Sequence, residues 1–130
     1  LHTIEVNEEL HDMIEHYVNE SPYKNNIRLY TGDAKKIIPE MDVLFDLVFI
    51  DADKESYSLY YDLVFDKVRK GGYIIADNVL WSGNVIKPGP EWDDETVHVV
   101  KFNDKVQSDN RVKNLLLPVR DGLMIIEKTI

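Results

Sequence analysis

Apolar residues recur along this chain with two periods, one typical of strands and the other of helices. Short apolar runs bounded by turn residues predict strands, and apolar residues three or four positions apart predict helices. The predicted strands span residues 2–6, 27–30, 47–50, 73–76, 111–117 and 123–128. One helix is predicted directly after the capping residue Asn7. Three more are predicted over residues 35–41, 57–68 and 93–107.

The order of these elements is typical of an α/β domain. The runs 47–50 and 73–76 contain no polar residue, which predicts strands buried on both faces. The helical stretch between them is long enough for a right-handed crossover, so these two strands should be parallel. Gly71 and Gly72 are expected to end that helix, and residues 81–92 to form a loop. The chain shows no internal repeat or linker, and we predict one domain over residues 1–130.

Acidic residues follow the two central strands. Asp51 comes directly after the run 47–50, and Asp77 and Asn78 come after the run 73–76. Parallel neighbouring strands end at the same edge of a sheet, where open α/β sheets bind ligands. Two carboxylates and an amide suit a hard divalent cation such as Mg²⁺ or Ca²⁺ better than zinc. The alternative is that these side chains only cap turns at the strand ends.

Composition narrows the function classes. The formal net charge of -9 disfavours nucleic acid and anionic membranes as partners, because the chain has no net positive field. The absence of cysteine removes disulfides, thiolate catalysis and cysteine-ligated zinc. No apolar run is long enough to span a bilayer and no signal peptide is visible, so a cytoplasmic protein without membrane contact is expected.

Five short motifs occur in a fixed order over nearly the whole chain. They are Ile4-Glu5, Gly32-Asp33-Ala34, Phe49-Ile50-Asp51-Ala52-Asp53-Lys54, Ala76-Asp77-Asn78-Val79-Leu80-Trp81 and Pro118-Val119-Arg120-Asp121-Gly122-Leu123. In this order the chain resembles the bacterial branch of the cation-dependent class I O-methyltransferases, the relatives of caffeoyl-CoA and catechol O-methyltransferases. The resemblance implies a Rossmann-like, mostly parallel sheet with a C-terminal antiparallel hairpin. It also implies O-methyl transfer from S-adenosylmethionine, a divalent cation (Mg²⁺, Mn²⁺ or Ca²⁺), a small catechol-like or vicinal-diol acceptor, and a homodimer.

The resemblance also implies roles for particular residues. The cofactor would be bound by Glu5, Gly32, Asp33, Ala34, Asp51 and Asp53. The metal would be held by Asp51, Asp77 and Asn78, and catalysis would depend on Lys54 as the base together with Asp51. Trp81 and Ser82 would contact the acceptor. Tyr57, Tyr60 and Tyr61 are expected to be packing residues of the crossover helix.

Two features of the family have no counterpart in this sequence: the glycine-rich turn after the first strand and the N-terminal helices. We therefore expect the chain to be the C-terminal part of one methyltransferase domain, lacking the first strand of the sheet. In the family that strand lies between the strands that end at Glu5 and Asp51. The chain alone should then either associate with itself through strand edges or show a sheet split between Val6 and Asp46.

Two other functions compete with this interpretation. The same chemistry could act on a hydroxylated base of transfer RNA, although the acidic balance counts against it. Alternatively, the chain could be a non-catalytic, receiver-like module whose acidic cluster binds Mg²⁺. Glu5 and Asp33-Ala34 separate these readings, because a receiver needs neither a ribose acceptor nor an adenine wall.

Overall fold

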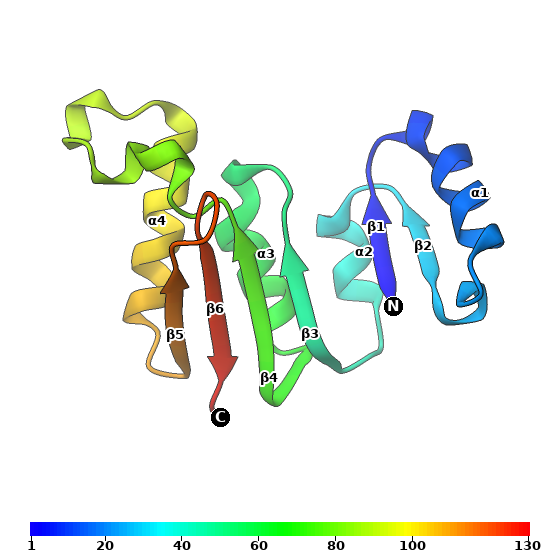
Figure 1. Cartoon of the computed structure of the whole chain (residues 1–130). Coiled ribbons are helices and arrows are strands. Elements are labelled where there is room, and N and C mark those ends of the chain that lie inside the picture. Colours follow the sequence, from blue (N-terminus) through cyan, green and yellow to red (C-terminus); the bar gives the residue numbers. More distant parts are fainter. The chain divides into compact units, whose positions relative to one another are not determined.

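A computed structural model describes residues 1–130, which form two compact units, residues 1–42 and 43–130. Each unit has its own hydrogen-bonded sheet, of two strands in the first and four in the second (Figure 1). The sheet is thus split between Val6 and Asp46, which is one of the two outcomes expected from the sequence. That both units belong to one methyltransferase domain stays a prediction. No helix combines the length and the apolar character needed to span a membrane.

The first unit is a short β-α-β-α segment. Its two strands are parallel, with Glu5 opposite Thr31 in the register. Asn7 caps a 3-10 turn rather than the α-helix itself, because its side chain accepts a hydrogen bond from the backbone N–H of Glu9. The elements are β1 (His2–Glu5), η1 (Glu8–Leu10), α1 (His11–Glu20), η2 (Lys24–Asn26), β2 (Arg28–Thr31) and α2 (Ala34–Glu40).

The second unit is a mixed sheet with strand order β3-β4-β6-β5. Strands β3 and β4 are parallel, as predicted, and β6 pairs antiparallel with both β4 and β5. The C-terminal antiparallel hairpin is therefore confirmed. The elements are β3 (Phe45–Ile50), η3 (Lys54–Ser56), α3 (Tyr57–Phe65), β4 (Val68–Asp77), η4 (Trp81–Ile86), η5 (Gly89–Glu91), α4 (Asp94–Ser108), β5 (Val112–Leu117) and β6 (Leu123–Lys128).

Helices α3 and α4 pack together against one face of this sheet (Figure 1). Phe102 of α4 is fully buried between two tyrosines of α3, with ring centroids 5.4 Å from Tyr57 and 6.3 Å from Tyr61, both edge-on. The sheet contributes Ile74 and Ile126 to the same core. Packing of α3 against α4 thus fixes the position of the residues that begin α3.

The prediction that the two central strands are buried on both faces is wrong for this unit. Leu47, Phe49 and Tyr73 are 53%, 57% and 42% exposed, whereas Ile50 and Ala76 are buried. The difference arises because, within residues 43–130, helices cover only the face that carries the buried side chains. Alternate apolar residues therefore face outward.

The glycine pair does not end the crossover helix, contrary to the prediction. Helix α3 ends at Phe65, and Gly71 and Gly72 lie within β4. The register between β3 and β4 is irregular here, and Gly71 has a positive φ of 75°. A Cβ on Gly72 would lie 3.0 Å from the carbonyl oxygen of Asp46, so this glycine permits close approach of two backbones. The predicted loop 81–92 likewise contains the short 3-10 helices η4 and η5.

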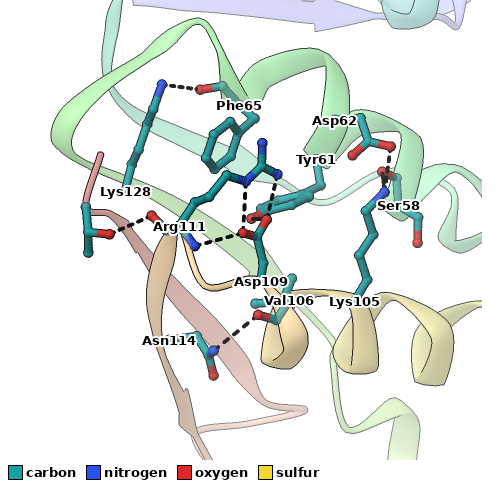
Figure 2. A network of polar contacts seen from close by, with 11 residues as sticks. Ser58, Tyr61, Asp62, Phe65, Lys105, Val106, Asp109, Arg111, Asn114 and Lys128 are labelled. Atoms are coloured by element: carbon teal, nitrogen blue, oxygen red, sulfur yellow. Dashed lines mark hydrogen bonds and ion pairs between the residues drawn. The ribbon is translucent and has the colours of Figure 1, made fainter.

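A polar network joins the end of α4 to α3 and β5 (Figure 2). The Asp109 carboxylate accepts hydrogen bonds from the Arg111 guanidinium at 2.7 and 2.9 Å and from the Tyr61 hydroxyl at 2.9 Å. The Arg111 guanidinium lies 3.9 Å from the centre of the Phe65 ring. Hydrogen bonds from Arg111 hold the pKa of Asp109 well below its ordinary value.

This network predicts a pH-dependent contribution to stability. Asp109→Asn in the intact protein should lower the free energy of unfolding by about 1–3 kcal/mol at pH 7, because charged hydrogen bonds are lost. A depressed pKa in the folded state stabilises the protein above the unfolded pKa of about 4, and this contribution disappears as pH falls through the folded value. The difference from wild type in urea unfolding should therefore shrink below about pH 4.

Asp104→Asn is the matched control, because Asp104 is an exposed aspartate of α4, the helix that Asp109 follows. It should change the unfolding free energy little at either pH. A difference between Asp109→Asn and wild type that is constant from pH 7 to pH 3 would contradict the role of the Asp109 carboxylate.

Candidate functional site

The carboxyl ends of β3 and β4 bring together most of the predicted site residues of the second unit. Ile50 pairs with Ala76 in the parallel register, and Asp51 and Asp77 are the next residues of the two segments. The two strands are parallel, as predicted, and they are also neighbours in the sheet. Asp51 and Asp77 therefore emerge at the same edge of the sheet, followed on β4 by Asn78.

Lys54 is the centre of this edge. Its side chain is only 7% exposed. A lysine is almost never buried to this extent unless its charge has partners. The ammonium donates a hydrogen bond to Asn78 Oδ1 at 3.0 Å and to the Tyr57 hydroxyl, and it lies 3.6 Å from Asp51 Oδ1. It also lies 5.5 Å from the ring centre of Trp81. The ammonium thus contacts residues that follow β3, begin α3 and follow β4.

Burial changes the acid–base properties of this lysine. It lowers the pKa of the Lys54 ammonium below its ordinary value, because water no longer solvates the charge. The carboxylates of Asp51, Asp77 and Asp121 act in the opposite direction but do not reverse the shift. A lysine in this environment gives up its proton more readily than one on the surface.

Tyr57 is fully buried beneath the ammonium. Its hydroxyl lies 3.0 Å from the carbonyl oxygen of Asp77 and 3.4 Å from that of Ile50, the last residues of β4 and β3. The hydroxyl has one proton to donate, and the shorter distance favours the Asp77 carbonyl. Burial and the nearby carboxylates, Asp51 first, raise the pKa of Tyr57, so the phenol stays protonated.

The donors predicted to hold a metal are oxygens of two carboxylates and one amide. Two of them, on Asp51 and Asn78, already converge on the positive charge of Lys54. Asp77 Oδ1 accepts a hydrogen bond from the backbone N–H of Asn78 at 2.7 Å, which leaves its second oxygen for other contacts. The structure contains no cluster of three or more His, Cys, Asp or Glu side chains arranged for a metal. The donor set nonetheless fits a hard cation in its chemistry.

A second loop supports the segment that follows β4. The carboxylate of Asp121 accepts a hydrogen bond from the backbone N–H of Ser82 at 2.6 Å, and its carbonyl accepts one from Leu80 at 2.9 Å. A Cβ on Gly122 would lie 2.6 Å from Leu80 Cγ, so glycine allows this contact. The sequence pattern assigned no role to Asp121. Its position in the motif that spans residues 118–123 is the signal that could have marked it.

The tyrosines of α3 are packing residues, as predicted, but their hydroxyls also have specific partners. Tyr60 is 7% exposed and donates a hydrogen bond to Asp53 Oδ1 at 2.8 Å. Tyr57 and Tyr61, both fully buried, contact Lys54 and Asp109 respectively. The apolar periodicity of the helix indicated their burial but not these contacts.

In the first unit, the predicted cofactor residues gather at the carboxyl ends of β1 and β2. The backbone N–H of Gly32 donates to the carbonyl of Glu5 at 2.8 Å. Glu5 Oε1 accepts a hydrogen bond from the backbone of Asn7, and Asp33 Oδ1 caps α2 at the N–H of Lys35. Gly32 has a φ of 135°, which favours glycine. Ala34 is the first residue of α2.

The chain is similar in sequence and in fold to known methyltransferases. A probable caffeoyl-CoA O-methyltransferase of Dictyostelium discoideum is 39% identical over 109 residues, covering 80% of this chain and 47% of that protein. The chain thus spans about half the length of this relative. Solved structures of an SAH-bound methyltransferase from Podospora anserina and of an O-methyltransferase from Bacillus cereus in complex with SAH both align with a TM-score of 0.87.

These structures are 26% and 25% identical to the chain, covering 99% and 98% of it and 60% and 62% of their own chains. Their similarity confirms the Rossmann-like α/β methyltransferase fold. The family model described as O-methyltransferase matches residues 1–129. The chain therefore belongs to the O-methyltransferase family.

Proposed function

We propose that the protein carrying this chain transfers a methyl group from S-adenosylmethionine to a hydroxyl of a small catechol-like or vicinal-diol acceptor, with the help of a divalent cation. The observation that carries this proposal is the buried ammonium of Lys54 among Asp51, Asn78 and Tyr57. Family membership and a relative described as a probable caffeoyl-CoA O-methyltransferase support the reaction and the acceptor class. Family membership also favours this function over the receiver-like module.

Four residues of the first unit are proposed to contact the adenosine part of the cofactor. A carboxylate offers about four acceptor sites, so Glu5 can bind Asn7 and still accept hydrogen bonds from two ribose hydroxyls. Gly32, Asp33 and Ala34 would lie along the adenine ring, where the small side chain of Ala34 allows close approach. SAH, which is S-adenosylmethionine without its methyl group, is bound to two structural relatives.

In the second unit, Asp53 and Asp51 are proposed to bind the methionine part. The Asp53 carboxylate accepts a hydrogen bond from Tyr60, which orients it. A carboxylate accepts several hydrogen bonds and is the right chemical group to bind the amino group of the cofactor. When bound, S-adenosylmethionine supplies an electrophilic methyl group on a sulfonium.

Asp51, Asp77 and Asn78 are proposed to hold the divalent cation, with Mg²⁺ as the first choice and Mn²⁺ or Ca²⁺ as alternatives. A bound cation would lower the pKa of an acceptor hydroxyl. The convergence of Asp51 and Asn78 oxygens on Lys54 supports this assignment, because it shows that their lone pairs are directed at a common positive charge.

Lys54 is proposed to be the base. Its Nζ, once neutral, would take the proton from the acceptor hydroxyl, and the oxygen left behind is the nucleophile. The lowered pKa of Lys54 supports this role. Trp81 and Ser82, at the start of η4, are proposed to contact the acceptor. The ring of Trp81 lies near Lys54 Nζ. Holding both reactants in line supplies much of the remaining rate enhancement.

Removing one proposed ligand should weaken metal binding. In calorimetric titrations of the intact protein with Mg²⁺, Mn²⁺ and Ca²⁺, Asp77→Ala should reduce affinity by at least about tenfold, because a carboxylate donor is lost. Asp104→Ala removes an exposed aspartate of α4 and should bind as wild type does. Equal affinity of wild type and Asp77→Ala would show that the metal ligands are elsewhere.

Removing the proposed base should affect turnover more than cofactor binding. With radiolabelled S-adenosylmethionine, Mg²⁺ and catechol or caffeoyl-CoA, Lys54→Met should lower kcat by about 10²–10⁴-fold. Its affinity for the cofactor should stay close to that of wild type, because Nζ acts on the acceptor.

Lys105→Met is the matched control, since Lys105 also pairs with an aspartate, Asp62, and lies 5.9 Å from the ring of a tyrosine, Tyr61. It should retain wild-type kcat. Wild-type turnover by Lys54→Met would remove Lys54 from the mechanism, and no transfer by the wild-type protein to either acceptor would contradict the proposed acceptor class.

A further inference from the structure

The hydroxyl of Tyr57 joins three parts of the edge that carries Lys54. It accepts a hydrogen bond from Lys54 Nζ and contacts the carbonyl oxygens of Asp77 and Ile50. These carbonyls belong to the final residues of β4 and β3. One oxygen atom therefore connects the ammonium to the ends of both strands from which the proposed metal ligands emerge.

The ring of Tyr57 is held more firmly than packing within α3 alone would achieve. It is fully buried and lies edge-on to Phe102 of α4, with centroids 5.4 Å apart. Its ring centre lies 4.3 Å from Lys54 Nζ, which is hydrogen-bonded at the hydroxyl end of the ring. A rigid ring with one fixed hydroxyl restricts where the flexible lysine side chain can place its amine.

We infer that Tyr57 is a positioning residue for methyl transfer. Its hydroxyl accepts a hydrogen bond from Lys54 Nζ and so keeps this nitrogen where it can reach the hydroxyl of the acceptor. The inference rests on the proposed function of Lys54 as the base. Without the Tyr57 hydroxyl, Nζ keeps Asn78 and Asp51 as partners but loses the contact on the side of the core. Displacement of a reacting group by about 1 Å can cost about 100-fold in rate.

The chain offers a close control in Tyr61. It is also fully buried, lies on the same helix one turn along, packs edge-on to Phe102 and donates a hydrogen bond, but to Asp109. Tyr57→Phe and Tyr61→Phe each remove one oxygen from a buried ring. Both should lower the Tm of the intact protein, whereas only Tyr57→Phe should lower kcat, by about 10- to 100-fold. Cofactor affinity should stay close to wild type in both.

A double-mutant cycle with Lys54→Met separates positioning from general destabilisation. If Tyr57 acts through Lys54, Tyr57→Phe should have almost no further effect on kcat in a Lys54→Met protein. The same full loss in both backgrounds, or wild-type kcat in Tyr57→Phe, would overturn the inference. Wild-type kcat in Lys54→Met itself would instead overturn the proposed base, and this inference with it.

Turnover is expressed per folded site, counted by binding of radiolabelled S-adenosylmethionine. If Tyr57→Phe does not fold, p-aminophenylalanine at position 57 keeps an N–H donor and a lone pair at the same place on the ring. That variant should recover a kcat near wild type. A folded p-aminophenylalanine protein with kcat as low as that of Lys54→Met would count against the positioning role.

Discussion

The burial of one ammonium group is the constraint on which the carboxyl edge of the four-stranded sheet depends. A charge removed from water destabilises a protein unless hydrogen bonds and opposite charges replace the solvent. Lys54 meets this requirement with partners from three separate segments: Asp51 after β3, Asn78 after β4, and Tyr57 at the start of α3. The two strand ends and the helix must therefore keep a fixed arrangement. Burial in this arrangement lowers the pKa of the Lys54 ammonium, although Asp51 acts in the opposite direction.

The site and the hydrophobic core share residues, so packing is transmitted to the chemistry. Phe102 of α4 contacts both Tyr57, whose hydroxyl binds Lys54, and Tyr61, whose hydroxyl binds Asp109. At the end of α3, Lys128 donates a hydrogen bond to the carbonyl of Phe65 at 2.9 Å (Figure 2). It donates another to the carbonyl of Val68, also at 2.9 Å. Helix α3 is thus held along its length by polar contacts as well as by apolar burial.

The order and type of the main elements could be predicted because apolar periodicity and capping residues are local signals. The edge that carries Asp51 and Asp77 could be located because parallel strands end on the same side of a sheet. The exposure of Leu47 and Phe49 could not be predicted, since it depends on which helices cover each face of the sheet. The contacts of Tyr57 and Asp121 also escaped the pattern: a buried tyrosine has the same periodicity whether or not its hydroxyl has a functional partner. The roles of Glu5 and of the metal ligands stay predictions.

Two features of this edge act together in the proposed reaction: the strand ends bind a cation, and Tyr57 keeps Lys54 in place. A crystal structure of the intact protein with Mn²⁺ and SAH, measured with anomalous diffraction, tests this most directly. The account predicts one anomalous peak at coordination distance, roughly 2.0–2.6 Å, from oxygens of Asp51, Asp77 and Asn78. It also predicts that Lys54 Nζ stays hydrogen-bonded to the Tyr57 hydroxyl. A peak away from these three residues, or a lysine amine that has left Tyr57 when the ion binds, would contradict it.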